Sequence, residues 1–217
     1  MQDFFRRNHF LLRRLHSLSG IIPVGGFLIF HMWENAKAFQ GAEVYNESIR
    51  AINALPFVWA LEIFVIFLPL YFHAIYGIFI ALDAKYNVTN YGYGRNWAFV
   101  FQRMSGLFTL FWVTYHIWHF RFQKLLGAYG PYQGGESMSG LPSFKVLQEA
   151  FSNPVVAVLY GVGVVAAAYH LSNGIYTFLI TWGITIGPRS QRISNIVTTA
   201  AFVGVSALGI VALVAFR

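Results

Sequence analysis

One stretch of sequence decides the fold of this chain: PVVAVLYGVGVVAAAYHLSNGIYTFLITW, residues Pro154 to Trp182. It contains no Asp, Glu, Lys or Arg, and about 20 apolar residues are enough for a helix to cross the hydrocarbon layer of a membrane. It does contain His170, a side chain that is costly in lipid unless it faces a bundle interior and has a partner there. The stretch therefore predicts a membrane-spanning helix that carries a functional histidine.

The rest of the chain is similarly apolar. Of its 217 residues, 57% are hydrophobic and 11% are charged, and the mean hydropathy is +0.54, whereas about 25% of the residues of a soluble domain are charged. We therefore expect an all-α membrane protein, a single domain over residues 1–217. Its five transmembrane helices are expected at residues 18–40, 57–82, 97–120, 154–182 and 195–216.

The first of these spans has features of a secretory signal, because Arg13 and Arg14 precede it and Ala36-Lys37-Ala38 is similar to a cleavage site. However, the apolar run is long for a signal, and cleavage would remove His31. We expect the segment to stay in the protein as a span.

Lysine and arginine positions orient the bundle, because cytoplasmic segments of membrane proteins carry an excess of them. With the N-terminus in the cytoplasm, nine would lie inside and six outside, which favours this orientation. The inner set is Arg6, Arg7, Arg13, Arg14, Lys85, Arg95, Arg103, Arg189 and Arg192; the outer set is Lys37, Arg50, Arg121, Lys124, Lys145 and Arg217. The basic inner face suits membrane lipid headgroups or an acidic partner subunit, and we expect no nucleic-acid partner.

The chain has no cysteine, which excludes a cysteine-held iron–sulfur cluster, a covalently attached haem and any disulfide. Four histidines lie in four different spans: His31, His73, His116 and His170. An isolated intramembrane histidine can also bond a neighbouring helix, relay protons or bind a transported ion. Four of them at two matched depths favour axial ligation of haem iron.

The depths follow from a rise of about 1.5 Å per helical residue. His73 lies ten residues before Asp83 and His170 twelve before Trp182, so both are about 15 to 18 Å from the inner boundary. Glycines follow them one turn later, Gly77 and Gly174, and we expect these to leave room for a flat macrocycle. The arithmetic predicts that His73 and His170 form an inner haem site.

The other two histidines lie further out. His31 is seventeen residues beyond Arg14 and His116 twenty-one beyond Arg95, which places them about 25 and 31 Å from the inner side. We expect His31 and His116 to form an outer haem site, about one haem's width from the inner one.

Further polar residues near these levels are candidates for supporting roles. For the propionates of the inner haem they are Arg14, Arg103, Ser17 and Ser19, with snorkelling to lipid headgroups as the alternative for the arginines. His16 is expected at the inner surface, near propionates or a quinone, His119 at the outer rim, and His9 in the N-terminal segment.

Glu62 is the one acidic residue that we assign to a span; Glu34 is assigned to the outer side. A carboxylate near the outer haem suits proton uptake by a quinone. The alternative is an interfacial residue paired with Arg50 or Lys37. Between the third and fourth spans we expect a loop at Gly130–Gly135 and a short interfacial helix at Ser143–Phe151.

Several segments closely resemble a known family: RRLHSLSG (13–20), YFHAIYGIFIA (71–81), RNWAFVFQRMSG (95–106), YHLSNG (169–174) and TWGITIGPRSQRIS (181–194). They are similar to the di-haem cytochrome b membrane anchor of succinate dehydrogenase and fumarate reductase, in its Bacillus-type form with one five-helix subunit. The likeness runs nearly end to end.

The resemblance implies that His31 with His116 and His73 with His170 are the axial ligands of two haems b. It also implies partners: a flavoprotein and an iron–sulfur subunit on the cytoplasmic side, which oxidise succinate, and menaquinone as the electron acceptor. The chain itself has no nucleotide-binding glycine pattern, because Gly92-Tyr93-Gly94-Arg95 follows no predicted strand. We therefore expect no succinate-oxidising site here.

Three alternatives stay open at this point. The complex could run in reverse as a fumarate reductase. The chain could be the di-haem subunit of another quinone-linked dehydrogenase, of the hydrogenase or formate dehydrogenase type. A haem-free transporter is the most distant alternative.

Overall fold

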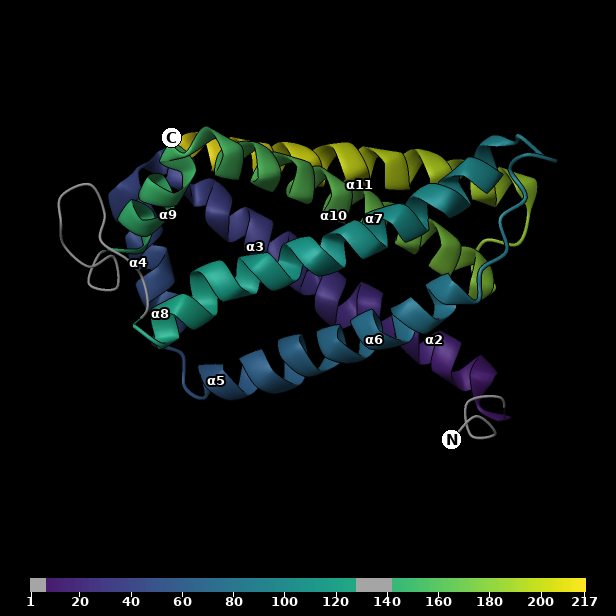
Figure 1. Ribbon diagram of the computed structural model, residues 1–217, viewed down its shortest axis with the longest axis horizontal. Helices are drawn as coiled ribbons and strands as arrows, with labels where there is room; N and C mark the ends of the chain where they lie inside the picture. Colours follow the sequence, from purple (N-terminus) through teal and green to yellow (C-terminus); the bar gives the residue numbers. More distant parts are fainter. Residues whose placement is uncertain (1–6, 128–141) are drawn as a thin grey trace.

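The computed structural model describes residues 7–127 and 142–217, and within them the chain is a bundle of helices with no strand (Figure 1). The first helix combines α2 (His9–Ser19), η1 (Gly20–Gly25), α3 (Gly26–Ala36) and η2 (Lys37–Gln40), and α4 (Ala42–Asn53) follows. The second combines α5 (Val58–Leu61), η3 (Glu62–Phe67) and α6 (Leu68–Leu82). The third combines α7 (Gly94–Ile117), η4 (Trp118–Phe122) and α8 (Gln123–Leu125). The last three are α9 (Ser143–Ser152), α10 (Pro154–Thr181) and α11 (Pro188–Ala215).

Four helices within the described ranges are long and apolar enough to cross a membrane: His9–Gln40, Val58–Leu82, Pro154–Thr181 and Pro188–Ala215. They confirm four of the five expected spans. The helix Gly94–Leu125 runs along the bundle beside them (Figure 1), but polar residues such as Arg95, Gln102 and Arg103 interrupt its apolar sequence. The fifth span therefore stays a prediction.

The helices extend beyond the predicted apolar segments. The first starts at His9 rather than 18 and the last at Pro188 rather than 195, because polar turns can continue a helix outside the hydrocarbon layer. Helix α9 confirms the predicted short helix at Ser143–Phe151, whereas α4 was not expected. The predicted loop at Gly130–Gly135, and Arg6 of the inner basic set, lie outside the described residues.

Three of the long helices contain a π-helical turn, and in two of them a proline lies in or just after it. In the first helix this turn, Gly20–Gly25, contains Pro23, and in the second the turn Glu62–Phe67 ends just before Pro69. Proline has no N–H and cannot complete the α-helical hydrogen-bond ladder, and π-helical turns are one way in which a helix accommodates the defect.

Helix α10 is the most buried element and packs between α7 and α11. Small residues on it, such as Ala167 and Ala168, are almost wholly enclosed, as is typical of close helix packing in membranes. At one end of the bundle, α4, α9 and the C-terminal Phe216 enclose an aromatic cluster. Helix α2 and the C-terminal end of α11 lie toward opposite ends of the long axis (Figure 1).

Candidate functional site

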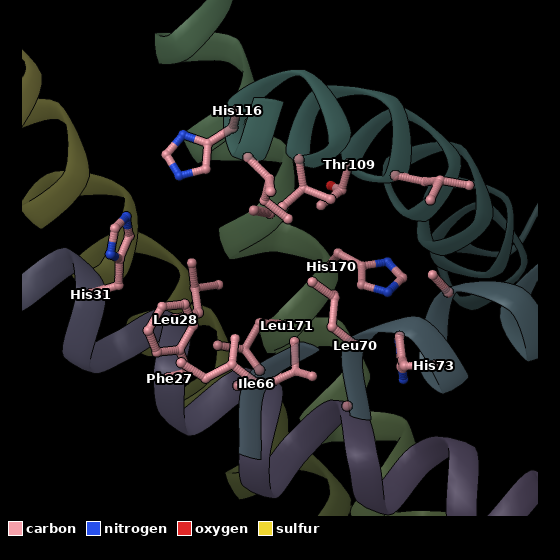
Figure 2. Close-up of a pocket in the computed structure, with 18 of the residues that line it drawn as sticks. Phe27, Leu28, His31, Ile66, Leu70, His73, Thr109, His116, His170 and Leu171 are labelled. Atoms are coloured by element: carbon pink, nitrogen blue, oxygen red, sulfur yellow. The ribbon is translucent and has the colours of Figure 1, made fainter. Parts of the chain in front are cut away.

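A continuous cavity of about 2050 Å³ runs through the bundle, and all four intramembrane histidines line it. Pockets for small molecules usually have volumes of about 300–1,000 Å³, so this cavity has room for two large ligands. Figure 2 shows His31 and His116 at one end of it and His73 and His170 at the other, with apolar side chains such as Leu28 and Leu171 between the pairs.

The histidines meet in the two pairs that their depths predicted. His73 on α6 faces His170 on α10, with ring centroids 6.1 Å apart and ring planes at 83°. His31 on α3 faces His116 on α7, with centroids 5.6 Å apart and planes at 79°. Two imidazoles on opposite faces of one metal ion have centroids roughly 6 Å apart when each nitrogen lies about 2 Å from the metal. Both pairs therefore have the spacing that a bis-histidine haem needs.

The inner pair is oriented by backbone carbonyls. His73 Nδ1 lies 2.9 Å from the carbonyl oxygen of His16, and His170 Nδ1 lies 3.0 Å from that of Gln102. A carbonyl only accepts hydrogen bonds, so each Nδ1 carries the proton and donates it, which leaves the Nε2 lone pair of each ring free for a metal. This arrangement is typical of metal-ligating histidines.

The outer pair has a different environment. His31 Nε2 lies 3.4 Å from the side-chain nitrogen of Asn35, which also donates to the His31 carbonyl at 2.7 Å. Among the described residues, His116 Nδ1 is buried without a hydrogen-bond partner, and the Trp112 ring stacks on the His116 ring at 5.6 Å. A buried polar atom without a partner is costly, so this end fits a bound polar group.

The glycines nearest the inner histidine rings are not the two that the sequence singled out. A Cβ at Gly77 would lie 3.1 Å from His16 Nε2, and one at Gly174 would lie 3.6 Å from the Gln102 side chain. Both glycines line the cavity, so their role in leaving room for a macrocycle stays a prediction. The glycines that the inner histidines contact are Gly20 and Gly106 instead.

Three of the four predicted propionate contacts line the cavity: Arg14, Ser17 and Arg103. Arg103 Nε is buried without a partner in the described part of the chain, and a side-chain nitrogen of Arg14 lies 3.5 Å from the Thr181 carbonyl. Ser19 does not line the cavity, because its hydroxyl donates to the His16 carbonyl at 3.0 Å.

Glu62 lines the cavity near its outer end and forms an ion pair with Arg121 of η4. The two partners suggested by the sequence, Arg50 and Lys37, are therefore not the ones it uses. Its side chain remains about a quarter exposed, so a carboxylate is available at the cavity wall.

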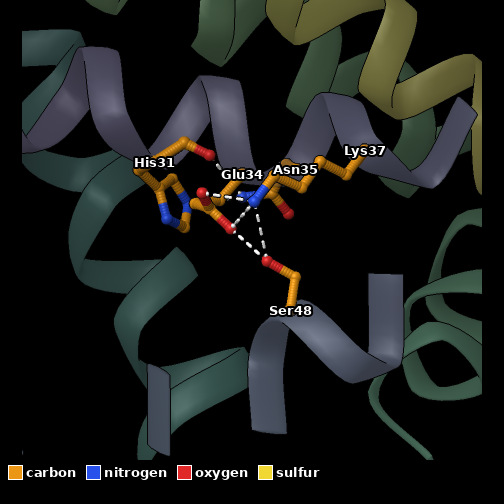
Figure 3. A network of polar contacts seen from close by, with 5 residues as sticks. All are labelled: His31, Glu34, Asn35, Lys37 and Ser48. Atoms are coloured by element: carbon orange, nitrogen blue, oxygen red, sulfur yellow. Dashed lines mark hydrogen bonds and ion pairs between the residues drawn. The ribbon is translucent and has the colours of Figure 1, made fainter. Parts of the chain in front are cut away.

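A second acidic residue, Glu34, lies within a candidate span, His9–Gln40, so the assignment of Glu62 as the one acidic residue in a span was wrong. Glu34 of α3 is buried, and its carboxylate accepts hydrogen bonds from Lys37 Nζ at 2.8 and 2.9 Å and from the Ser48 hydroxyl (Figure 3). Burial, and secondarily the charge of Glu34, raise the pKa of the nearby Tyr45 phenol, so the phenol stays protonated and donates to Asn35. This network ties α4 to the helix that carries His31.

The three remaining histidines differ in their position relative to the cavity. The His16 ring lies parallel to the His73 ring, with centroids 4.1 Å apart, and lines the cavity, so His16 belongs to the inner site rather than to the membrane surface. His119 Nδ1 lies 3.4 Å from the Tyr160 hydroxyl, and His119 does not line the cavity. His9 is exposed at the cavity mouth.

Sequence reasoning overlooked two side chains that contact the histidines, Asn35 and Gln102. Gln102 bonds the His170 carbonyl and accepts from Asn173 at 2.8 Å. A glutamine inside an apolar helix was the available signal, since such a polar group needs a partner.

The fold and the cavity define a helical membrane protein with two cross-helix histidine pairs at different levels. Comparison with known proteins agrees with this class. Residues 88–209 match the family model of the succinate dehydrogenase/fumarate reductase transmembrane subunit. The chain is also 46% identical over 207 residues to the succinate dehydrogenase cytochrome b558 subunit of Bacillus subtilis (strain 168), covering 95% of this chain and 96% of that relative. The chain belongs to the succinate dehydrogenase/fumarate reductase transmembrane subunit family.

Proposed function

We propose that this chain is the di-haem cytochrome b membrane anchor of a succinate:quinone oxidoreductase (complex II) and carries electrons from an iron–sulfur subunit to menaquinone. Family membership and the name of the Bacillus subtilis relative support the anchor role. The observation that carries the haem assignment is the orientation of the inner pair, in which His73 and His170 each donate Nδ1–H to a carbonyl of a neighbouring helix.

In this proposal His73 and His170 hold the iron of an inner haem, and His31 and His116 that of an outer haem. Bound haem b supplies one-electron redox chemistry at each level. Arg14, Ser17 and Arg103 contact the propionates at the inner end, where the cavity carries an excess of positive charge.

Glu62 is proposed to hold a proton at the outer end of the cavity, where menaquinone would be reduced. Its position on the cavity wall and its pairing with the half-exposed Arg121 support this. The buried Glu34 has two strong partners and is proposed to be structural.

Membrane topology follows from the same elements. We propose one domain with five spans, of which Gly94–Leu125 is the third, and with the N-terminus in the cytoplasm of a bacterial cell. The course of that helix along the bundle, and the position of α2 and of the C-terminal end of α11 toward opposite ends of the long axis, support this (Figure 1). The flavoprotein and iron–sulfur subunits would bind the basic inner face and oxidise succinate there.

The printed family description gives a second candidate, because it includes fumarate reductase. Electrons would then move in the opposite direction, from menaquinol through the outer and inner haems to the iron–sulfur subunit. Family membership favours both readings over a hydrogenase or formate dehydrogenase subunit and over a transporter.

Purification of the tagged chain from its native membrane tests the proposal. We expect a flavoprotein and an iron–sulfur protein to copurify, two haems b per chain, and low-spin b-type bands that succinate reduces. A preparation without haem, or with the subunits of another dehydrogenase, would contradict it.

A further inference from the structure

Two segments on different helices end in the same Ser-Gly pair, and each contacts one histidine of the inner pair. One is LHSLSG, residues 15–20 of the first helix, and the other is FQRMSG, residues 101–106 of the third. Each ends in Ser-Gly, and each places a backbone carbonyl four residues before the glycine. We call the two segments the Ser-Gly cradles.

The same two hydrogen bonds occur in both cradles. In the first, the His16 carbonyl accepts from His73 Nδ1 at 2.9 Å and from the Ser19 hydroxyl at 3.0 Å. In the second, the Gln102 carbonyl accepts from His170 Nδ1 at 3.0 Å and from the Ser105 hydroxyl at 3.1 Å. Each histidine therefore meets an acceptor that is already bonded to a serine.

The glycine of each cradle lets the ring come this close. A Cβ at Gly20 would lie 2.3 Å from His73 Cε1, and a Cβ at Gly106 would lie 2.6 Å from His170 Cε1. Real side chains do not approach so closely, and both neighbours are stiff rings whose backbone belongs to another helix. Any side chain at these positions must push the imidazole away.

We infer that the Ser-Gly cradles are a matched pair of positioning devices that set the ring orientation and donor strength of the inner haem's axial histidines. The inference rests on the proposed function. A carbonyl that accepts Nδ1–H orients the imidazole and makes Nε2 a stronger ligand, while the serine hydroxyl competes for that carbonyl and moderates the effect. The two cradles hold the ring planes at 83° to one another.

The outer pair gives an internal reference, because its rings do not share this environment. His116 Nδ1 has no partner among the described residues, and His31 Nε2 lies 3.4 Å from the side-chain nitrogen of Asn35 on its own helix. A change in a cradle should therefore affect the inner haem and leave the outer haem as it was.

The test uses two cradle variants with matched controls. Gly20→Ala and Gly106→Ala each introduce the clashing Cβ. Gly26→Ala, further along the first helix, and Gly204→Ala, on α11, introduce a Cβ with nothing within 4 Å. The purified complex is measured by EPR and by optical redox titration, and His73→Ala identifies the inner-haem signals.

We expect Gly20→Ala and Gly106→Ala to convert the inner haem to a high-spin form or to lower its largest g value, which reports ligand-plane orientation, and both controls to match the wild type. If the cradle variants also match the wild type, the inference is wrong. If the wild-type complex has no low-spin haem, the proposed function itself fails.

If the Gly20→Ala and Gly106→Ala variants do not accumulate, removal of the serine hydroxyls is a milder test. In Ser19→Ala and Ser105→Ala the carbonyl loses its competing donor, so Nδ1–H bonds it more strongly and the ferric haem is favoured. We expect a lower midpoint potential for the inner haem alone, by up to a tenfold change in the reduced-to-oxidised ratio, or about 59 mV. An unchanged inner potential would overturn the inference.

Discussion

The buried Glu34 network makes a quantitative prediction about the outer end of the bundle. Lys37→Met removes the only cation that contacts Glu34 in the described structure, and the Glu34 side chain is only 9% exposed while that of Lys37 is 28% exposed. Two unit charges 4 Å apart attract by about 4 kcal/mol at an effective dielectric constant of 20. Exposed pairs contribute about 0–1 kcal/mol, and loss of one partner of a buried pair costs about 3–5 kcal/mol.

Because the pair is partly exposed on the lysine side, we expect Lys37→Met to cost about 2 kcal/mol. For a chain of this size that corresponds to a fall in Tm of about 4–8 °C. The assay is thermal unfolding of the purified complex in detergent, followed by circular dichroism. Lys145→Met is the matched control, because its ion pair with Glu149 is long, at 3.9 Å, and 45% exposed on the lysine side, and it should cost less than about 1 kcal/mol.

A double-mutant cycle completes the test. Glu34→Gln removes the other charge, so the double variant Glu34→Gln/Lys37→Met should be more stable than the sum of the two single changes predicts. Strict additivity, or a loss in Lys37→Met no larger than in Lys145→Met, would refute the reasoning.

Three further predictions concern the cavity. In Gly163→Ala a Cβ would lie 2.1 Å from Trp112, whose ring stacks on His116. We expect overpacking to destabilise the protein by about 1–3 kcal/mol and to perturb the outer haem in the optical spectrum. In the control Gly161→Ala the nearest neighbour of the Cβ lies at 3.6 Å, so the outer-haem spectrum should not change. Glu62→Gln should lower succinate-dependent menaquinone reduction several-fold without changing haem content, and the exposed Glu47→Gln should not; equal rates in both would remove Glu62 from the proton path. An electron that moves from the negative inner face to the positive outer face releases about 2.3 kcal/mol per 100 mV. Collapsing the potential in proteoliposomes should therefore slow succinate-to-menaquinone turnover. An unchanged rate would contradict the proposed sidedness.

Much of the architecture could be predicted because it depends on length and hydropathy alone. The run from Pro154 to Trp182 needed only an apolar length to be identified as a span, and the rise per residue sorted the histidines into levels. The pairs His31–His116 and His73–His170 that it predicted are in contact in the structure.

Contacts between helices could not be predicted in the same way, because they depend on rotation and crossing angle. Gly77 and Gly174 share a helical face with their histidines, yet the glycines packed directly against the histidine rings are Gly20 and Gly106 of other helices. The partner of Glu62 is set by how η4 approaches the second helix. Glu34 was not counted among the acidic residues of the spans, because the sequence does not show that Lys37 and Ser48 satisfy its carboxylate inside the protein.

The central claim is that each haem lies between one specific pair of histidines. Four single variants, His31→Ala, His73→Ala, His116→Ala and His170→Ala, test it by low-temperature optical and EPR spectra of the purified complex. We predict that His73→Ala and His170→Ala disturb one haem, and that His31→Ala and His116→Ala disturb the other. Loss of the same haem in His73→Ala and His116→Ala would contradict the pairing.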